Sequence, residues 1–155
     1  MELKKIESFK VNHQTLFPGL YVSRKDVFNG VTVTTFDIRF TAPNKEPCLM
    51  GDAIHTLEHL GATFLRNSSR KNEVIYFGPM GCKTGFYLVM FGDLTSENVF
   101  PLIVETMEFC INFSGEIPGA TAVECGNYAY QNLEMAKKYA KKYLSDLTKF
   151  KRLSY

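Results

Sequence analysis

The sequence predicts a single α+β domain in which an antiparallel β-sheet is covered by α-helices. Segments with strand character follow one another along the chain and do not alternate strictly with helices, which favours antiparallel pairing. The 155 residues contain 45% hydrophobic residues, enough for one buried core, and no repeat, low-complexity tract or linker divides them. We therefore expect one domain over residues 1–155.

Three strands are expected in the first two thirds of the chain. Residues 32–40 (TVTTFDIRF) are rich in β-branched and aromatic side chains and end at an Ala-Pro-Asn turn sequence. Alternate residues of a strand face opposite sides, so Asp37 and Arg39 lie on the face away from the apolar one. The apolar face holds Phe36, Ile38 and Phe40. Two further strands are expected over residues 73–77 and 84–91, on either side of a tight glycine- and proline-containing segment.

Two helices are expected in the last third of the chain. The first is capped by Thr95 or Ser96 and runs to about Phe113, but Pro101 removes a backbone donor and predicts a kink or a late start. The second covers residues 132–147, where apolar residues recur with helical spacing.

An earlier helix carries the clearest chemical motif. Asp52 is typical of an N-cap for a helix over residues 53–66. Within it, His55, Glu58 and His59 form an H-x-x-E-H motif, and at about 100° per residue all three lie on one helix face. Two imidazoles one turn apart can bind the same metal ion, and the carboxylate can serve as an acid or base. The alternative interpretation is a solvated polar face without metal.

A catalytic metal usually has about three protein ligands and one open position, so a third ligand is required. Cys125 lies beside a glycine in an irregular segment over residues 117–127, and is either that ligand or a buried structural thiol. Cys82, at the entrance of a strand between glycines, is either a reactive thiolate or a small core residue. Cys48 and Cys110 are expected to have no chemical role.

The bulk properties exclude several classes of partner. The formal net charge is only +2, so we expect no nucleic acid partner. The lysine-rich stretch over residues 137–143 has helical periodicity and indicates a solvated helix face. Neither a signal peptide nor a membrane-spanning apolar run is evident. We therefore expect a cytoplasmic protein without membrane contact, in which the four cysteines are reduced.

Taken together, these residues closely resemble the LuxS family over nearly the whole chain. The matching stretches are Glu7-Ser8-Phe9 with His13, residues 36–40 (FDIRF), 43–45 (PNK), 54–60 (IHTLEHL) and 79–87 (PMGCKTGFY), Ile117-Pro118 and Cys125-Gly126. The combination of IHTLEHL with PMGCKTGFY is highly specific. The fold that this resemblance implies is the LuxS/metallohydrolase-like α+β fold, as one lyase domain over residues 1–155.

The resemblance also implies roles for the motif residues. His55, His59 and Cys125 would hold one divalent metal per subunit, natively Fe(II), with Zn(II) or Co(II) able to replace it. Glu58 and Cys82 would be the pair of general acid/base residues.

The resemblance further implies that Ser8, His13 and Arg39 contact the substrate, S-ribosylhomocysteine. The family cleaves its thioether by carbonyl migration and β-elimination, giving homocysteine and 4,5-dihydroxy-2,3-pentanedione. The second product is the precursor of the quorum-sensing signal autoinducer-2, and the reaction belongs to the activated methyl cycle. The active site would lie at the interface of a homodimer.

Three positions depart from the family pattern. Tyr76 stands where aspartate is expected, Thr41 where cysteine is frequent, and Gln131 where histidine is frequent. None is an expected metal ligand or acid/base residue, so the implied reaction class stands. The departure at Tyr76 puts the recognition of the homocysteine end of the substrate in question.

Two other functions are compatible with the motif. A small metal-dependent hydrolase or peptidase would also use an inverted H-x-x-E-H helix, but it would not require the second thiol, Cys82. A non-catalytic binding module would have a structural zinc site closed by four ligands, with Cys82 as the fourth.

Overall fold

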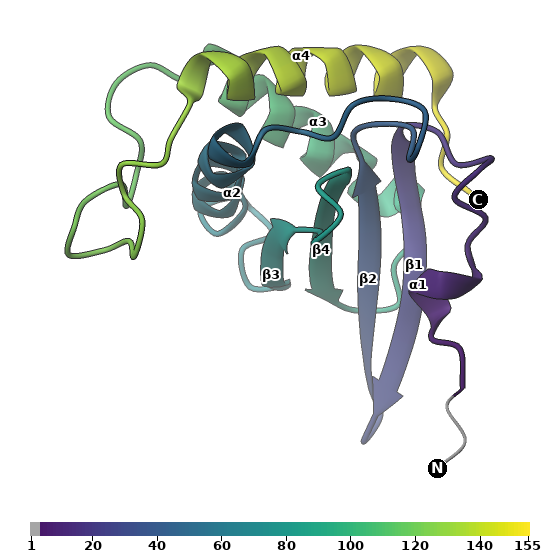
Figure 1. The fold of residues 1–155 in the computed structure, drawn as a ribbon. Coiled ribbons are helices and arrows are strands. Elements are labelled where there is room, and N and C mark those ends of the chain that lie inside the picture. Colours follow the sequence, from purple (N-terminus) through teal and green to yellow (C-terminus); the bar gives the residue numbers. More distant parts are fainter. Residues whose placement is uncertain (1–3) are drawn as a thin grey trace.

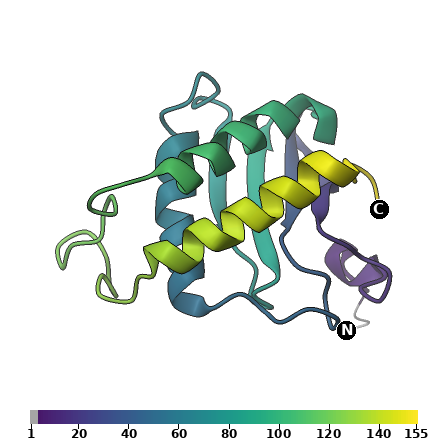
Figure 2. The ribbon, with the colours of Figure 1, turned by 90° about the horizontal axis from the view of Figure 1, so that it is seen from above.

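The computed structural model describes residues 4–155, apart from the side chains of residues 7 and 8. The strands of this range are β1 (Gly19–Phe28), β2 (Val31–Arg39), β3 (Val74–Pro79) and β4 (Gly85–Phe91). The helices of this range are α1 (Glu7–Lys10), α2 (Gly51–Leu65), α3 (Ser96–Asn112) and α4 (Leu133–Phe150). The strands form one antiparallel sheet in the order β1-β2-β4-β3, and α2, α3 and α4 lie together on one face of it (Figures 1 and 2). The predicted α+β class is confirmed.

Strand β1 is not among the strands predicted from the sequence. It pairs with β2 along its whole length, from Gly19 opposite Arg39 to Phe28 opposite Val31. The two strands are joined at Asn29-Gly30, where both residues have positive φ, 49° and 77°. An Asn-Gly pair between apolar residues is a strong hairpin signal because both residues tolerate this conformation, so the sequence did contain evidence for the strand.

The core lies between the sheet and the three helices. The predicted apolar face of β2 is confirmed, because Phe36, Ile38 and Phe40 are almost completely buried. Tyr143 of α4 stacks on Phe40 with ring centroids 4.3 Å apart, and its hydroxyl donates to the Gly19 carbonyl. Burying each such side chain contributes about 1.5–3 kcal/mol, which fixes the helices on the sheet.

The start of α2 differs from the expectation. Asp52 is not the N-cap, because the helix already begins at Gly51, and the Ile54 amide donates to the carbonyl of Met50. Asp52 instead lies in the first turn, where its carboxylate accepts from the Asn132 side chain and so ties α2 to the beginning of α4.

The two later helices largely follow the prediction. Thr95 caps α3 in a reciprocal capping box with Asn98. Pro101 lies inside this helix, so of the two expected outcomes, a kink or a late start, the late start is wrong. Asn132 caps α4, whose end at Phe150 extends three residues beyond the predicted one. Within residues 4–155, no helix is both long and apolar enough to cross a bilayer.

Candidate metal centre

Three predicted ligands come together at one point. His55 and His59 project from α2, and Cys125 lies in the irregular segment between α3 and α4. The Nε2 atoms of the two histidines are 3.0 Å apart, and the Cys125 sulfur is 3.4 Å from Nε2 of His55. All three ligand atoms lie within 4.8 Å of one another. The α-helix therefore aligns the imidazoles, and the segment before α4 brings the thiol to them.

The other nitrogen of each imidazole is held by a backbone carbonyl. His55 Nδ1 donates to the carbonyl of Tyr130 at 2.8 Å, and His59 Nδ1 donates to that of Pro118 at 2.7 Å. A carbonyl only accepts, so Nδ1 carries the proton in both rings and Nε2 presents a lone pair. This second-sphere arrangement is the one that orients histidines as metal ligands.

The arrangement fits a divalent cation. With Nδ1 protonated, the Nε2 lone pairs face each other at 3.0 Å and repel, and a cation between them removes that repulsion. Nitrogens bound to one tetrahedral ion at about 2.0–2.1 Å lie about 3.3 Å apart, close to the spacing found here. Two imidazoles and a thiolate leave one position open, as catalytic metal sites do.

Two residues near the ligands, Gly119 and Gln131, lie close to the histidine rings. Gly119 has φ of 71°, and a Cβ atom there would lie 3.3 Å from Nδ1 of His59. Glycine therefore permits both the turn and the close approach of the Pro118 carbonyl. Gln131, one of the departures from the family pattern, places its amide 3.3 Å from Nδ1 of His55 and accepts from the Thr56 hydroxyl.

An open hollow of about 450 Å³ lies beside the ligands. His55 and Glu58 line it from α2, and Gly81 and Lys83 line it from the β3–β4 connection. Glu58 is half-buried and has no hydrogen-bond partner among the described residues, so its carboxylate is available to a ligand in the hollow. Cys82, although it lies between Gly81 and Lys83, is not part of this lining.

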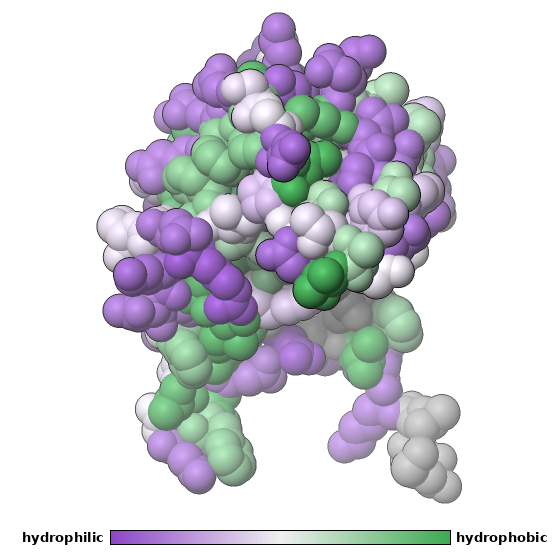
Figure 3. All heavy atoms as spheres, turned by 90° about the vertical axis from the view of Figure 1, so that its left-hand side faces the viewer, coloured by the Kyte–Doolittle hydropathy of each residue, from purple (hydrophilic) through white to green (hydrophobic). Residues whose placement is uncertain are grey.

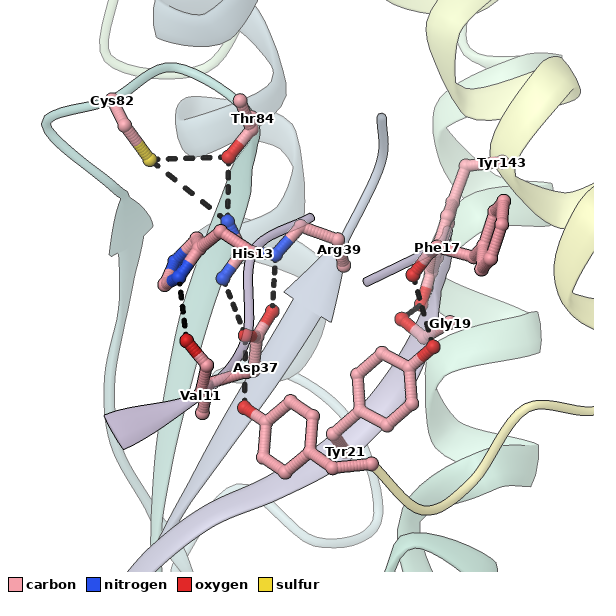
Figure 4. A network of polar contacts seen from close by, with 11 residues as sticks. Val11, His13, Phe17, Gly19, Tyr21, Asp37, Arg39, Cys82, Thr84 and Tyr143 are labelled. Atoms are coloured by element: carbon pink, nitrogen blue, oxygen red, sulfur yellow. Dashed lines mark hydrogen bonds and ion pairs between the residues drawn. The ribbon is translucent and has the colours of Figure 1, made fainter. Parts of the chain in front are cut away.

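Cys82 belongs to a second polar cluster on the face of the sheet opposite α2, α3 and α4 (Figure 4). Its sulfur lies 3.1 Å from the Thr84 hydroxyl and 3.9 Å from Nη1 of Arg39. Arg39 also donates to Thr84 through Nη1 and to both carboxylate oxygens of Asp37 through Nε and Nη2. Within the described residues, no hydrogen bond joins this cluster to the three metal-ligand candidates.

The charged pair of β2 is buried on its own face. Asp37 is 2% and Arg39 3% exposed, so the prediction that they leave the apolar face is confirmed, but they do not reach solvent. Burial lowers the pKa of Arg39, but the charge and hydrogen bonds of Asp37, together with smaller contributions from Cys82 and Tyr155, outweigh this effect, and the pKa is raised overall. The guanidinium therefore stays charged and places a fixed positive charge beside the Cys82 sulfur.

The N-terminal candidates lie on the same face. His13 is half-buried, and its Nδ1 contacts the carbonyl of Val11 at 2.9 Å. Figure 4 shows its imidazole on the side of the sheet that carries Cys82 and Arg39. The side chain of Ser8 lies outside the described residues, so its predicted role stays a prediction.

Several groups at the two clusters escape sequence reasoning. Backbone carbonyls leave no residue-type signal, so Pro118 and Tyr130 could not be found from the sequence. The surface that carries the irregular segment mixes hydrophilic and hydrophobic side chains (Figure 3). The segment has no periodic pattern from which its path could be predicted. Tyr76 is half exposed, and with Tyr87 and Arg24 it lines a separate pocket on the face of the sheet opposite α2, α3 and α4.

The chain is similar to one protein family over almost its entire length. Residues 6–153 match the model of the S-ribosylhomocysteinase (LuxS) family. The S-ribosylhomocysteine lyase of Finegoldia magna is 57% identical over 150 residues, which is 97% of this chain and 96% of that protein. The lyase of the same name from Clostridium acetobutylicum is 54% identical over 99% of both chains, and that of Borreliella burgdorferi (strain B31) is 53% identical over 96% of both.

Proposed function

The chain belongs to the S-ribosylhomocysteinase (LuxS) family and is a carbon–sulfur lyase acting on S-ribosylhomocysteine, and we propose that it works with a divalent metal bound to His55, His59 and Cys125. The observation that supports the metal is the pair of imidazole Nε2 lone pairs facing each other beside a thiol. The family resemblance implies these three residues as ligands, and the geometry that supports the proposal brings the same three together. We extend the proposal to the whole chain, residues 1–155, as one lyase domain.

Cleavage of the substrate requires a carbonyl to move along the ribose chain before the thioether can break. Each shift removes a proton from a carbon next to a carbonyl and returns a proton to the neighbouring carbon. The carbonyl then lies where loss of one more proton expels the sulfur from the β carbon. The carbon–sulfur bond breaks, homocysteine leaves as the thiol, and the sugar portion becomes 4,5-dihydroxy-2,3-pentanedione.

The protons in question are too weakly acidic for an unaided side chain. A divalent ion held by the three ligands supplies Lewis-acid stabilisation of the sugar oxygens when bound. We propose Fe(II) as the native ion, with Zn(II) or Co(II) able to replace it, since a mixed imidazole and thiolate ligand set suits all three.

Glu58 and Cys82 are the proposed acid/base pair. Glu58 faces the hollow next to His55 without a competing partner among the described residues, so it can move protons between oxygen and carbon. Cys82 is exposed, and its sulfur lies 3.9 Å from the Arg39 guanidinium, where it can exchange a proton with a bound substrate. Each such group accelerates a reaction by about 10²–10⁴-fold.

We propose that the complete site forms in a homodimer. Within one chain, the metal ligands and Glu58 belong to one cluster, and Cys82 and Arg39 to another. A second subunit would bring the opposite cluster to the hollow, with Arg39, His13 and Ser8 binding the substrate. We also propose that the protein acts in the cytoplasm and that its sugar-derived product is the precursor of autoinducer-2.

The two other functions fit less well. A peptidase with an inverted motif does not account for the family match, nor for an exposed cysteine held beside a buried arginine. A closed structural zinc site needs a fourth protein ligand. Among the described residues, the metal-ligand group contains His55, His59 and Cys125 but not Cys82.

The deciding experiment is turnover of S-ribosylhomocysteine by protein purified without oxygen. We expect release of homocysteine thiol that depends on added Fe(II) and stops when the metal is chelated. Folded, metal-loaded protein that releases no thiol would contradict the proposal.

A further inference from the structure

We propose that Tyr155 is a positioning residue for the reaction: its hydroxyl fixes Asp37, which fixes Arg39 against Cys82. The proposal rests on the function proposed above, because it assigns Arg39 and Cys82 to the active site. Tyr155 belongs to the segment after α4 and comes from a part of the sequence that carries no recognised motif.

The contact is a shared carboxylate. The Tyr155 hydroxyl donates to Oδ2 of Asp37 at 2.9 Å. Arg39 donates to the same oxygen through Nη2 and to Oδ1 through Nε at 3.0 Å. Three donors therefore hold one buried carboxylate, and the remaining nitrogen of Arg39, Nη1, is directed at Thr84 and Cys82.

The segment that carries Tyr155 is anchored before it reaches Asp37. Lys151 adopts a left-handed conformation, with φ of 44°, and ends α4. The Leu20 amide of β1 then donates to the Arg152 carbonyl at 3.0 Å. The Arg152 guanidinium lies over the rings of Phe17 and Phe150, at 5.0 and 4.2 Å from their centroids. The chain is thus turned around the β1 edge of the sheet towards the face opposite α2, α3 and α4.

The ring of Tyr155 is also held. It stacks on Tyr21, with centroids 4.7 Å apart and planes 13° from parallel. Tyr21 is opposite Asp37 in the β1–β2 register, so the stack places the hydroxyl over the carboxylate. Burial and the charge of Asp37 raise the pKa of Tyr155, which keeps its hydroxyl protonated and able to donate.

A carboxylate with three donors has little freedom to rotate, and the guanidinium paired with it is restrained in turn. Without the tyrosine hydroxyl, Oδ2 of Asp37 keeps only its bond to Arg39 among the described residues, and the pair can turn together. The distance from Nη1 to the Cys82 sulfur is already 3.9 Å, so even a small rotation weakens the attraction of the positive charge for a thiolate.

The test compares Tyr155→Phe with Tyr21→Phe. The first variant keeps the stacked ring and loses the donor to Asp37, together with the contact of the same hydroxyl with Ser23. The second also keeps the stack but loses a hydroxyl that donates to the Phe17 carbonyl, away from the carboxylate. Two readouts are measured: steady-state kinetics with S-ribosylhomocysteine, and the rate of Cys82 alkylation by iodoacetamide at fixed pH, followed by mass analysis of the peptide.

We expect Tyr155→Phe to lose about threefold to tenfold in kcat/KM and to slow Cys82 alkylation by a similar factor, with Tyr21→Phe unchanged in both. If Tyr155→Phe only loosened the structure, the exposed Cys82 thiol would react with iodoacetamide faster, not slower. Unchanged or faster alkylation in Tyr155→Phe, or equal losses in both variants, would overturn the proposal. If wild-type protein has no turnover, the proposed function fails, but slower alkylation in Tyr155→Phe alone still supports the positioning role.

Discussion

The Nε2 atoms of His55 and His59 face each other at 3.0 Å, while the Nδ1 atom of each ring donates to a carbonyl of the segment between α3 and α4. Such a pair of lone pairs is unfavourable in the neutral protein and favourable around a cation. The site should therefore bind metal strongly enough to affect stability.

Metal binding should raise the free energy of unfolding through this site. At a concentration of Co(II) or Zn(II) about a hundred times the Kd, linkage predicts about 2.7 kcal/mol of added stability. Cys125→Ala should lose most of this gain, because it removes the thiolate ligand. Thermal unfolding with and without metal measures the effect. Cys48→Ala, which removes an exposed thiol outside the site, is the matched control and should respond like wild type.

Glu58→Gln should keep the metal and lose turnover. The amide occupies the same space as the carboxylate but cannot accept a proton, so we expect kcat to fall by about 10²–10⁴-fold. Metal content measured on the same preparation separates chemistry from binding. Glu134→Gln changes an exposed carboxylate at the start of α4 and serves as the control. Wild-type turnover in Glu58→Gln would exclude the acid/base role.

Cys82→Ala distinguishes a catalytic thiol from a fourth ligand. We expect it to keep one metal per subunit, with an unchanged unfolding temperature, and to lose nearly all turnover. This expectation follows from the position of the sulfur beside Arg39 and Thr84, outside the group of metal-ligand candidates. Loss of both metal and stability would instead identify a closed structural site.

Mixing two inactive variants tests whether subunits share the site. His59→Gln damages the metal cluster and Cys82→Ala damages the other cluster. If each site uses one cluster from each subunit, half of the sites in a mixed dimer are intact. An equal mixture that exchanges subunits should then recover about a quarter of wild-type activity. No recovery from mixed dimers, with exchange verified by mass spectrometry, would place both clusters of a site in one chain.

Cys110 should make the fold sensitive to alkaline pH. Burial raises the pKa of this thiol from 9.0 to about 12. Unfolding then releases its proton between these values, so the stability it contributes is complete below about pH 9 and is lost as pH rises towards 12. Each pH unit in this window lowers the free energy of unfolding by at most about 1.4 kcal/mol.

The variant Cys110→Ala isolates this effect from the tyrosines that titrate in the same range. Its free energy of unfolding, measured with urea under reducing conditions, should decline less steeply between about pH 9 and 10.5 than that of wild type. Cys48→Ala should show the wild-type slope. Parallel slopes in Cys110→Ala and wild type would mean that the buried thiol ionises as easily in the folded state as in the unfolded chain.

The sequence was sufficient to predict those parts of the molecule that have a periodic residue pattern or a chemical motif. The alternation in β2 placed Phe36 in the core, and the spacing of His55 and His59 placed both on one helix face. Strand β1 was not predicted because its residues Ser23 to Asp26 are polar and break the apolar pattern, although Asn29-Gly30 marked its turn.

The remaining parts of the site depend on tertiary contacts that residue types do not encode. The carbonyls that orient the imidazoles could belong to any residue, and only the folded path of the chain selects Pro118 and Tyr130. The burial of Arg39 likewise depends on Thr84 and on Tyr155, which lies more than a hundred residues away in the sequence.

One stretch between α3 and α4 supplies Cys125 and both carbonyls that hold the imidazoles, while the sheet and helices beneath it form their core without it. The scaffold can therefore reach its final packing before the catalytic centre exists. We therefore expect metal binding to act on this one surface stretch and to leave the packing of the core unchanged. Availability of metal, more than folding, would set how much of the synthesised protein is active.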